Sequence, residues 1–419
     1  MGPLSIFLVL IFLLSMWRAF LMWHAFGSLM VLSLFCLGGR ILFWNHIILF
    51  AKECWMWRYH QTRGKHIRSF RNSSEIDFIG FFLFGAVGDA LALGVEMVNA
   101  TRMQTLMNDI RSGYFSVRTG KYAINYVAGQ YSDDTEQTLS NAKALIHLTD
   151  GSADDLLQFA CAEYDQSVSW WHQYGRQGHG SIKAYLENRS PDVLSKIREK
   201  NANGPPGNAP IMRGALLGFI KNPIDLRRIT FANADMTHPH PTARFASYGI
   251  AIAVHGLIVS REVTRPHIIK YVCENFEAIK PYLHTQPEHV CLAIMSDWLA
   301  RINEEPAPTR EGDYLHIDRK VLVDNPNGLG ADALTTLGAV LYFVKHLDPK
   351  SPWTTFENCV LLGGDVDTLA SVVMSIAGAQ GLIDWINFSN WPRWTIDGLE
   401  GVDYICEIAT QFEHWFYKQ

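Results

Sequence analysis

Beyond Glu75, apolar residues recur at three- and four-residue spacing through most of the chain. Such spacing predicts amphipathic helices that bury one face in a core, whereas the alternating pattern of half-buried strands is nearly absent. The clearest helical segments cover residues 139–148, 154–164, 243–259, 290–302, 331–345 and 368–381. Segments dense in Gly, Pro, Asn or acidic residues predict loops at residues 201–210, 303–313 and 324–330. We therefore expect one compact all-α domain over residues 72–419.

Residues 1–71 have a different pattern. Between Pro3 and Leu37 the only charged side chain is Arg18, and residues 19–39 supply the ~20 apolar positions that a membrane-spanning helix needs. Basic residues then follow, and such charge stays on the cytoplasmic side of a membrane. These are Lys52, Arg58, Arg63, Lys65, Arg68 and Arg71. We expect a membrane anchor that leaves the rest of the chain in the cytoplasm.

Two alternatives for residues 1–71 remain open. The segment could be a buried hydrophobic hairpin. It could also be an extension that the natural product lacks because translation starts later, in which case we expect a soluble cytoplasmic protein.

Composition narrows the class of protein. Of the 419 residues, 48% are hydrophobic and 18% are charged, which is typical of a globular protein and excludes a disordered one. The 36 Lys and Arg against 41 Asp and Glu give a net charge of -5, so no nucleic-acid partner is expected. Seven scattered cysteines have neither zinc-ligand spacing nor a disulfide framework, which favours a reducing compartment. We expect a monomer.

Two acidic clusters stand directly before predicted helices. The first acidic cluster is Tyr131-Ser132-Asp133-Asp134-Thr135-Glu136, and the second acidic cluster is Gly363-Gly364-Asp365-Val366-Asp367-Thr368. Either cluster alone could be a helix cap, since Asp favours the N-cap and Glu three residues later completes a capping box. Each cluster, however, has two carboxylates and a hydroxyl, and neighbouring carboxylates repel unless a cation or proton lies between them. Oxygen ligands without Cys or His favour Mg²⁺ or Mn²⁺, so we expect the two clusters to share a pair of such ions.

Further motifs give the chain a family resemblance. They are Gly88-Asp89-Ala90-Leu91 with Glu96, Gly207-Asn208 through Met212-Arg213, Thr237-His238-Pro239 and Gly378-Ala379. With the two acidic clusters, they make the chain resemble the ADP-ribosylglycohydrolases over roughly residues 76–385. The resemblance implies an orthogonal all-helical bundle with two Mg²⁺ ions. It also implies hydrolysis of the bond between ADP-ribose and a protein side chain, so that the expected partner is an ADP-ribosylated protein or an ADP-ribose conjugate.

The resemblance also implies roles for individual residues. The residues that match metal ligands are Ser132, Asp133, Asp134, Asp365, Asp367 and Thr368. Asp134 and Asp367 are candidates to accept the proton of the attacking water, and Glu96 matches a glutamate that approaches the metals. The residues that match the ADP-ribose cleft are Gly178, Gly180, Asn208 and His238. His240 is expected to be structural, because the prolines beside it indicate the start of a helix.

Three positions depart from the family pattern and keep other functions open. They are Ala92, Ala209 and Pro210. Pro210 matters most, because proline fixes φ and removes a backbone donor from a loop that is expected to approach phosphates. A catalytically inactive ADP-ribose-binding or structural homologue is one alternative. A different metal-dependent hydrolase, acting on a phosphoester, is the other. The acceptor residue, Arg, Ser or another, stays open as well.

Overall fold

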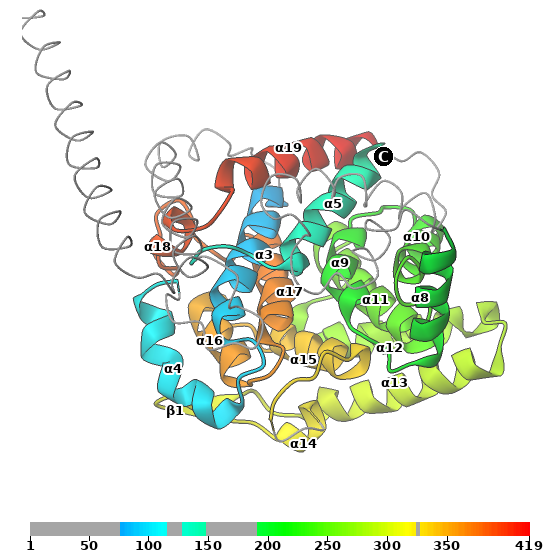
Figure 1. Cartoon of the computed structure of the whole chain (residues 1–419), viewed down its shortest axis with the longest axis horizontal. Coiled ribbons are helices and arrows are strands. Elements are labelled where there is room, and N and C mark those ends of the chain that lie inside the picture. Colours follow the sequence, from blue (N-terminus) through cyan, green and yellow to red (C-terminus); the bar gives the residue numbers. More distant parts are fainter. Residues whose placement is uncertain (1–75, 115–127, 148–190, 324–326) are drawn as a thin grey trace, which may run out of the picture. The chain divides into compact units, whose positions relative to one another are not determined.

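A computed structural model of the chain describes residues 76–114, 128–147, 191–323 and 327–419. The chain divides into two units, residues 1–61 and 62–419, and every described residue belongs to the second (Figure 1). The predicted membrane span at residues 19–39, the predicted helix at residues 154–164, and the two glycines Gly178 and Gly180 lie outside the described residues.

Helices form nearly all of the described domain. The longer ones are α3 (Phe78–Ala92), α4 (Ala100–Ser112), α5 (Asp133–His147), α8 (Pro191–Asn203), α9 (Ala209–Leu217), α10 (Pro223–Asp235), α11 (Pro241–Val254), α12 (Ile268–Ile279), α13 (Gln286–Glu304), α15 (Ala333–Lys345), α16 (Pro352–Leu361), α17 (Val366–Ala379) and α19 (Val402–Lys418). Short turns are η2 (Leu93–Val95), η4 (His255–Val259), η5 (Arg265–His267), η6 (Lys280–Tyr282), α14 (Arg319–Leu322) and α18 (Trp394–Asp397). The predicted helical architecture is thus confirmed in its main lines.

The differences from the predicted pattern are local. The loop predicted at residues 303–313 contains strand β1 (Thr309–Glu311), which pairs antiparallel with β2 (Tyr314–His316). Three-residue strands are too short to leave an alternating pattern. The loop predicted at residues 201–210 is shorter, because α8 continues to its end at Asn203 and α9 begins at Ala209. Pro210 therefore lies in the first turn of α9, where its missing N–H costs no helical hydrogen bond.

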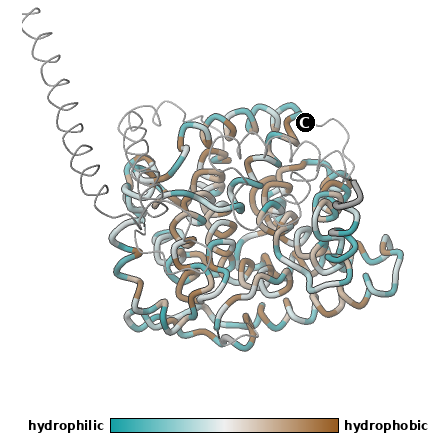
Figure 2. Tube along the Cα trace, viewed as in Figure 1, coloured by the Kyte–Doolittle hydropathy of each residue, from teal (hydrophilic) through white to brown (hydrophobic). Residues whose placement is uncertain are grey.

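The centre of the domain is the antiparallel pair α3 and α17, which run side by side in Figure 1. A Cβ added at Gly80 would lie 2.6 Å from the carbonyl oxygen of Gly378, and one added at Gly88 would lie 2.5 Å from that of Ala370. Small residues thus let the two backbones touch, and this contact brings the C-terminal end of α3 to the N-terminal end of α17. Figure 2 shows the two helices as largely hydrophobic, whereas the outer helices alternate.

Two described helical stretches are long and apolar enough to cross a membrane, Phe78–Val95 and Pro241–Val259. Within the domain, 100% and 83% of their apolar windows are buried. Their hydropathy is therefore that of core helices that are covered on all sides.

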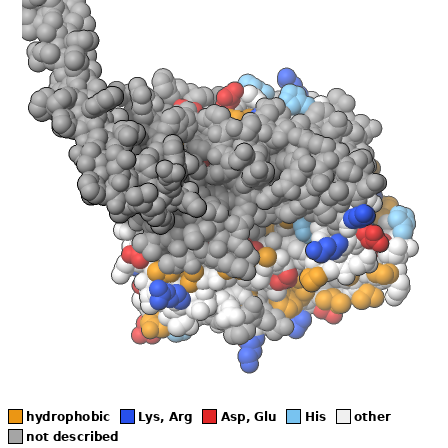
Figure 3. All heavy atoms as spheres, in the orientation of Figure 1, with side chains coloured by type: hydrophobic (Ala, Val, Ile, Leu, Met, Phe, Trp, Pro, Cys, Tyr) orange, Lys and Arg blue, Asp and Glu red, His pale blue; other side chains and the backbone are white. Residues whose placement is uncertain are grey.

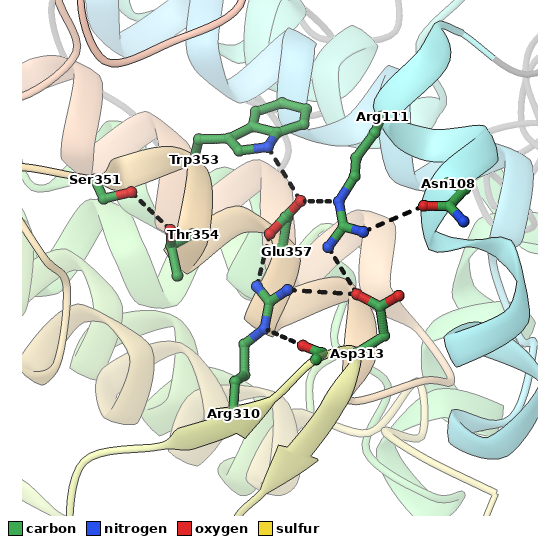
Figure 4. Close-up of polar contacts among 9 residues, drawn as sticks. Asn108, Arg111, Arg310, Asp313, Ser351, Trp353, Thr354 and Glu357 are labelled. Atoms are coloured by element: carbon green, nitrogen blue, oxygen red, sulfur yellow. Dashed lines mark hydrogen bonds and ion pairs between the residues drawn. The ribbon is translucent and has the colours of Figure 1, made fainter.

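An ion-pair network fastens α4 and the β1–β2 hairpin to α16 (Figure 4). The buried Glu357 of α16 accepts hydrogen bonds from Arg111 Nε and Arg310 Nη1, each at 2.6 Å, and from Trp353 Nε1 at 3.1 Å. Asp313 pairs with Arg111 at 2.7 Å. Because α16 leads directly into the second acidic cluster, the network also fixes the segment from which that cluster extends. On the described part of the face in Figure 3, basic and acidic side chains are interspersed with apolar ones.

Candidate metal centre

The two acidic clusters meet at the ends of α5 and α17. Thr368 Oγ1 donates to Asp134 Oδ1 at 3.2 Å and to Oδ2 at 3.3 Å, across 234 positions of sequence. Carboxylate oxygens of Asp89, Asp134 and Asp367 all lie within 4.8 Å of one another, and so do those of Glu96, Asp365 and Asp367. Two groups of acids therefore share Asp367. The prediction that the clusters converge is confirmed.

Helix capping does not explain why two carboxylates stand at the start of α5 and two at the start of α17. Asp365 occupies the N-cap position of α17, but within the described part of the chain its side chain makes no capping hydrogen bond. Asp133 is already the first residue of α5, and its Oδ2 accepts from Gln137 Nε2 at 3.2 Å. The free backbone N–H of Asp134 is instead satisfied by Ser132 Oγ at 3.1 Å. Helix capping therefore does not account for the pair of acids in each cluster.

Asp89, on α3, anchors the start of α5 from outside that helix. Its carboxylate accepts the backbone N–H of Ser132 at 2.9 Å and that of Thr135 at 3.1 Å. The Thr135 hydroxyl donates to it at 2.7 Å. The helix-capping role that was the alternative for the first acidic cluster is thus filled by Asp89 and Ser132. Asp89 belongs to the motif Gly88-Asp89-Ala90-Leu91, but no role was predicted for it. The available signal was a lone carboxylate in an otherwise apolar, fully buried helix, which has to be satisfied by specific donors.

Two glycines shape the loop that carries Asp365. Gly363 and Gly364 have φ of +75° and +86°, a region that favours glycine, and a Cβ at Gly364 would lie 2.0 Å from the Leu329 carbonyl oxygen. Gly364 donates to Val98 O at 2.8 Å, and its own carbonyl accepts from Met97 N at 2.7 Å. This pairing carries the neighbouring Glu96 to the second acidic cluster.

The electrostatics of the centre favour a bound cation. Asp134, Asp365 and Asp367 are only 2%, 4% and 3% exposed. Burial raises the pKa of Asp134 and of Asp367 well above the usual range, and repulsion by neighbouring carboxylates raises both further. The pKa of Asp133 is raised for the same reasons, burial first and Asp89 second. Either protons or cations must relieve this repulsion.

The donor set fits a hard divalent ion. Asp367 Oδ1 is buried and has no hydrogen-bond partner among the described residues. The surrounding groups are carboxylates and the hydroxyls of Ser132 and Thr368, and Ser132 Oγ lies 3.2 Å from Asp134 Oδ2. All of these are oxygen ligands of the kind that Mg²⁺ and Mn²⁺ prefer.

Asn208 and His238, which were predicted to bind substrate, border the centre in different ways. Asn208 Nδ2 donates to Asp365 Oδ2 at 2.6 Å and to Thr336 Oγ1 at 3.1 Å, so the amide supports a carboxylate. His238 lies against Gly207, because a Cβ there would be 2.9 Å from its Nε2. Burial and the charge of Arg213 lower the pKa of His238 to about 4. Contact of either residue with substrate stays a prediction.

His240 is structural, as predicted. It occupies the N-cap position of α11, and its Nδ1 accepts from Thr242 N at 3.1 Å. Of the predicted site residues in the described part of the chain, the six metal-ligand candidates and Glu96 are gathered at one place.

Comparisons with known proteins agree with this geometry. The sequence model of the ADP-ribosylglycohydrolases matches residues 73–419. The chain is 23% identical to the ADP-ribosylhydrolase ARH3 of Bos taurus over 66% of this chain and 77% of that one. It is 28% identical to the ADP-ribosyl-[dinitrogen reductase] glycohydrolase of Rhodospirillum rubrum over 44% of this chain and 58% of that one. A solved structure titled "ADP-ribosylglycohydrolase-related protein complex" matches with a TM-score of 0.54 and 20% identity, covering 81% of this chain and 98% of the other, which supports the fold.

Proposed function

This chain belongs to the ADP-ribosylglycohydrolase family, and from that premise we propose that it removes ADP-ribose from modified protein side chains with a binuclear Mg²⁺ centre. One observation carries the proposal. Carboxylates from residues more than 200 positions apart form two groups, each within 4.8 Å, that share Asp367.

The residues that would hold the ions are those of the two acidic clusters. Asp133, Asp134 and Ser132 come from the first cluster, and Asp365, Asp367 and Thr368 from the second. Asp89 belongs to the first of the two carboxylate groups although it was not among the predicted ligands, and its oxygens also anchor the start of α5 by accepting hydrogen bonds from Ser132 and Thr135. Bound Mg²⁺ supplies positive charge that orients the ribose hydroxyls and lowers the pKa of water, and Mn²⁺ fits the same donors.

Protein side chains would carry out the remaining steps of the hydrolysis. As positive charge develops on the ribose, Asp134 and Asp367 stabilise it, and one of them accepts the proton of the attacking water. Glu96 is half-buried and its carboxylate lies near those of Asp365 and Asp367, from where it would approach the metals. His238 and Asn208 bind more distant parts of ADP-ribose.

Product analysis with defined substrates tests the proposal. Arg-linked and Ser-linked ADP-ribosyl peptides would be incubated with the protein, with and without Mg²⁺. Release of free ADP-ribose with a restored side chain is the expected result, and it should be lost in Asp133→Asn and Asp365→Asn but kept in Asp225→Asn, an exposed control on α10. Metal-independent turnover, or full activity in both site variants, would reject the mechanism.

The same assay separates the two alternative functions. An inactive homologue would bind ADP-ribose without turnover. A phosphoester hydrolase would release phosphate and leave the glycosidic bond intact.

For residues 1–71 we propose a membrane anchor that holds residues 72–419 on the cytoplasmic side. The support is the apolar run at residues 19–39 followed by a basic segment that includes Lys52 and Arg71. The two apolar helices of the described domain are core helices and do not compete for this role.

A further inference from the structure

Arg213, on α9, is a charged side chain with no exposed surface. Its guanidinium is held against α10, where Nε donates to Asn233 Oδ1 at 2.6 Å and Nη2 donates to Asn233 O at 3.0 Å. Asn233 is fixed in turn, because its Nδ2 donates to Asn141 Oδ1 of α5 at 2.6 Å. The position of the guanidinium is therefore set by two neighbouring helices.

One chain of hydrogen bonds, the metal arm, leads from Arg213 through Gln137 to Asp133 in the candidate metal centre. Arg213 Nη1 donates to Gln137 Oε1 at 2.5 Å, and Gln137 Nε2 donates to Asp133 Oδ2 at 3.2 Å. An amide can present either its oxygen or its nitrogen, but guanidinium can only donate. Arg213 therefore forces the Gln137 oxygen toward itself and the Gln137 nitrogen toward Asp133.

A second chain of hydrogen bonds, the His238 arm, leads from Arg213 through Thr237 to His238. Arg213 Nη2 donates to Thr237 Oγ1 at 2.7 Å, and Thr237 Oγ1 lies 2.9 Å from His238 Nδ1. Because the hydroxyl oxygen accepts from Arg213, its proton is free to point at His238. When the hydroxyl donates to Nδ1, the ring proton resides on Nε2, the atom that faces Gly207.

We propose that Arg213 is a positioning residue that sets the orientation of two site side chains at once, the Gln137 amide that supports Asp133 and the Nε2–H tautomer of His238. The part of this inference that concerns turnover rests on the proposed function. Lysine cannot replace Arg213, because a single ammonium lacks the planar fork that reaches several acceptors in fixed directions. Outer groups of this kind typically change metal affinity or activity by ~10–100-fold.

The His238 arm is tested by the pair Thr237→Val and Thr237→Ser. Valine keeps the shape and removes the hydroxyl, whereas serine keeps the hydroxyl. Long-range ¹H–¹⁵N correlation spectra of protein labelled with [¹⁵N]histidine report the tautomer, and His238→Gln identifies the signal. We expect the Nε2–H form in the wild type and in Thr237→Ser, and a loss of that preference in Thr237→Val, with KM raised more than kcat is lowered. An unchanged tautomer in Thr237→Val would overturn this arm.

The metal arm is tested by Gln137→Met, with Mg²⁺ binding measured by calorimetry. Methionine is close in size and offers no amide donor to Asp133, so we expect Mg²⁺ affinity to fall by about tenfold or more while the His238 tautomer stays. Arg213→Lys should show both effects together. Unchanged Mg²⁺ affinity in Gln137→Met would contradict the proposal.

These experiments distinguish failure of the Arg213 proposal from misfolding of a variant and from failure of the proposed function. If Arg213→Lys does not fold, Thr237→Val with its control Thr237→Ser, and Gln137→Met, still decide, because each changes one side chain next to Arg213. If no substrate is turned over, the tautomer and the Mg²⁺ titration still report on Arg213, so failure of the proposed function is distinguishable from failure of this inference.

Discussion

Asp134 joins the two acidic clusters at the level of single atoms. Its carboxylate accepts from Ser132 Oγ, on its own side, and from Thr368 Oγ1, on the opposite helix. A hydroxyl in each cluster therefore orients the same acid. Such orientation matters because a ligand that is held in place loses less conformational entropy when it binds an ion.

Thr368→Val tests the role of this hydroxyl, which contacts Asp134 and is also a proposed metal ligand. Valine keeps the branched shape but removes the hydroxyl, so we expect Mg²⁺ affinity to fall by ~10–100-fold with little loss of stability. Calorimetric titration of Mg²⁺ measures the effect, with Thr368→Ser as the matched control that keeps the hydroxyl. Equal affinities for the valine and serine variants would contradict a role for this oxygen.

The sequence allowed the paired acids to be predicted, but not the groups that support them. Asp133, Asp134, Asp365 and Asp367 lie in two short runs whose mutual repulsion is visible in the sequence itself. The role of Asp89 depends on Ser132 and Thr135, 43 and 46 positions away, and no local pattern indicates that contact. The same holds for Arg213 and its partners.

At the scale of elements, the close packing of α3 on α17 decides where the acids lie. A Cβ at Gly85 would clash with a side-chain atom, Ser375 Oγ, whereas the nearest backbone atom, Ser371 O, would be in ordinary contact at 3.6 Å. At Gly88 the obstacle is backbone, the carbonyl of Ala370. The two glycines therefore differ in whether a second substitution can relieve the clash.

We expect Gly88→Ala to lower the free energy of unfolding by roughly 1–3 kcal/mol, because the two helices must separate. It should also weaken Mg²⁺ binding, since the adjacent Asp89 would move. Gly85→Ala combined with Ser375→Ala should instead be about as stable as Ser375→Ala alone, or more stable by up to ~1 kcal/mol, the gain for alanine over glycine in a helix. Urea unfolding measures both, and a neutral Gly88→Ala would refute the argument.

The bounds of helices and strands were predicted less well than the presence of the long helices. The helices at residues 331–345 and 368–381 were predicted closely, because whole turns of apolar residues face the core. The β1–β2 hairpin was missed because each strand has three residues, fewer than an alternating pattern needs. The loop predicted at residues 201–210 begins too early, because Asn and Gly at 201–204 are typical of loops, although α8 continues through Asn203.

At the scale of the whole molecule, the buried acids make stability depend on pH and on metal together. Their pKa values are raised in the folded chain, so without metal the folded state holds protons that the unfolded chain releases above its pKa of ~3.9. Stability of the metal-free protein therefore falls as pH rises through the folded-state pKa values. His238 has the opposite sign, since its pKa is lowered to about 4, but it is neutral in both states well above pH ~6.5.

We therefore expect Tm in EDTA to fall as pH rises above the ordinary carboxyl pKa of ~3.9, and the increase in Tm caused by Mg²⁺ to grow in the same direction, because the proposed ion and the protons would compete for the same oxygens. Scanning calorimetry in buffers of matched ionic strength measures this. The double variant Asp365→Asn/Asp367→Asn is the control and should lose most of both trends. A Mg²⁺ effect that shrinks as pH rises would contradict the assignment.

The N-terminal segment makes a separate prediction. The full chain should sediment with membranes, and a chain that begins at Arg71 should stay in the supernatant with unchanged kcat/KM, because the described site contains no residue before Asp89. Deleting only residues 1–17 preserves the apolar run at residues 19–39 and should leave the protein membrane-bound. A full chain that stays in the supernatant without detergent would exclude the anchor.

The split origin of the metal centre also has a consequence for biosynthesis. Asp134 leaves the ribosome early, but Asp365 and Asp367 follow only after more than 200 further residues have been translated. A growing polypeptide therefore exposes half of a chelating site for most of its synthesis. The acids of both clusters come together only when α17 docks on α3, so the proposed Mg²⁺ centre could be completed only at a late stage of maturation.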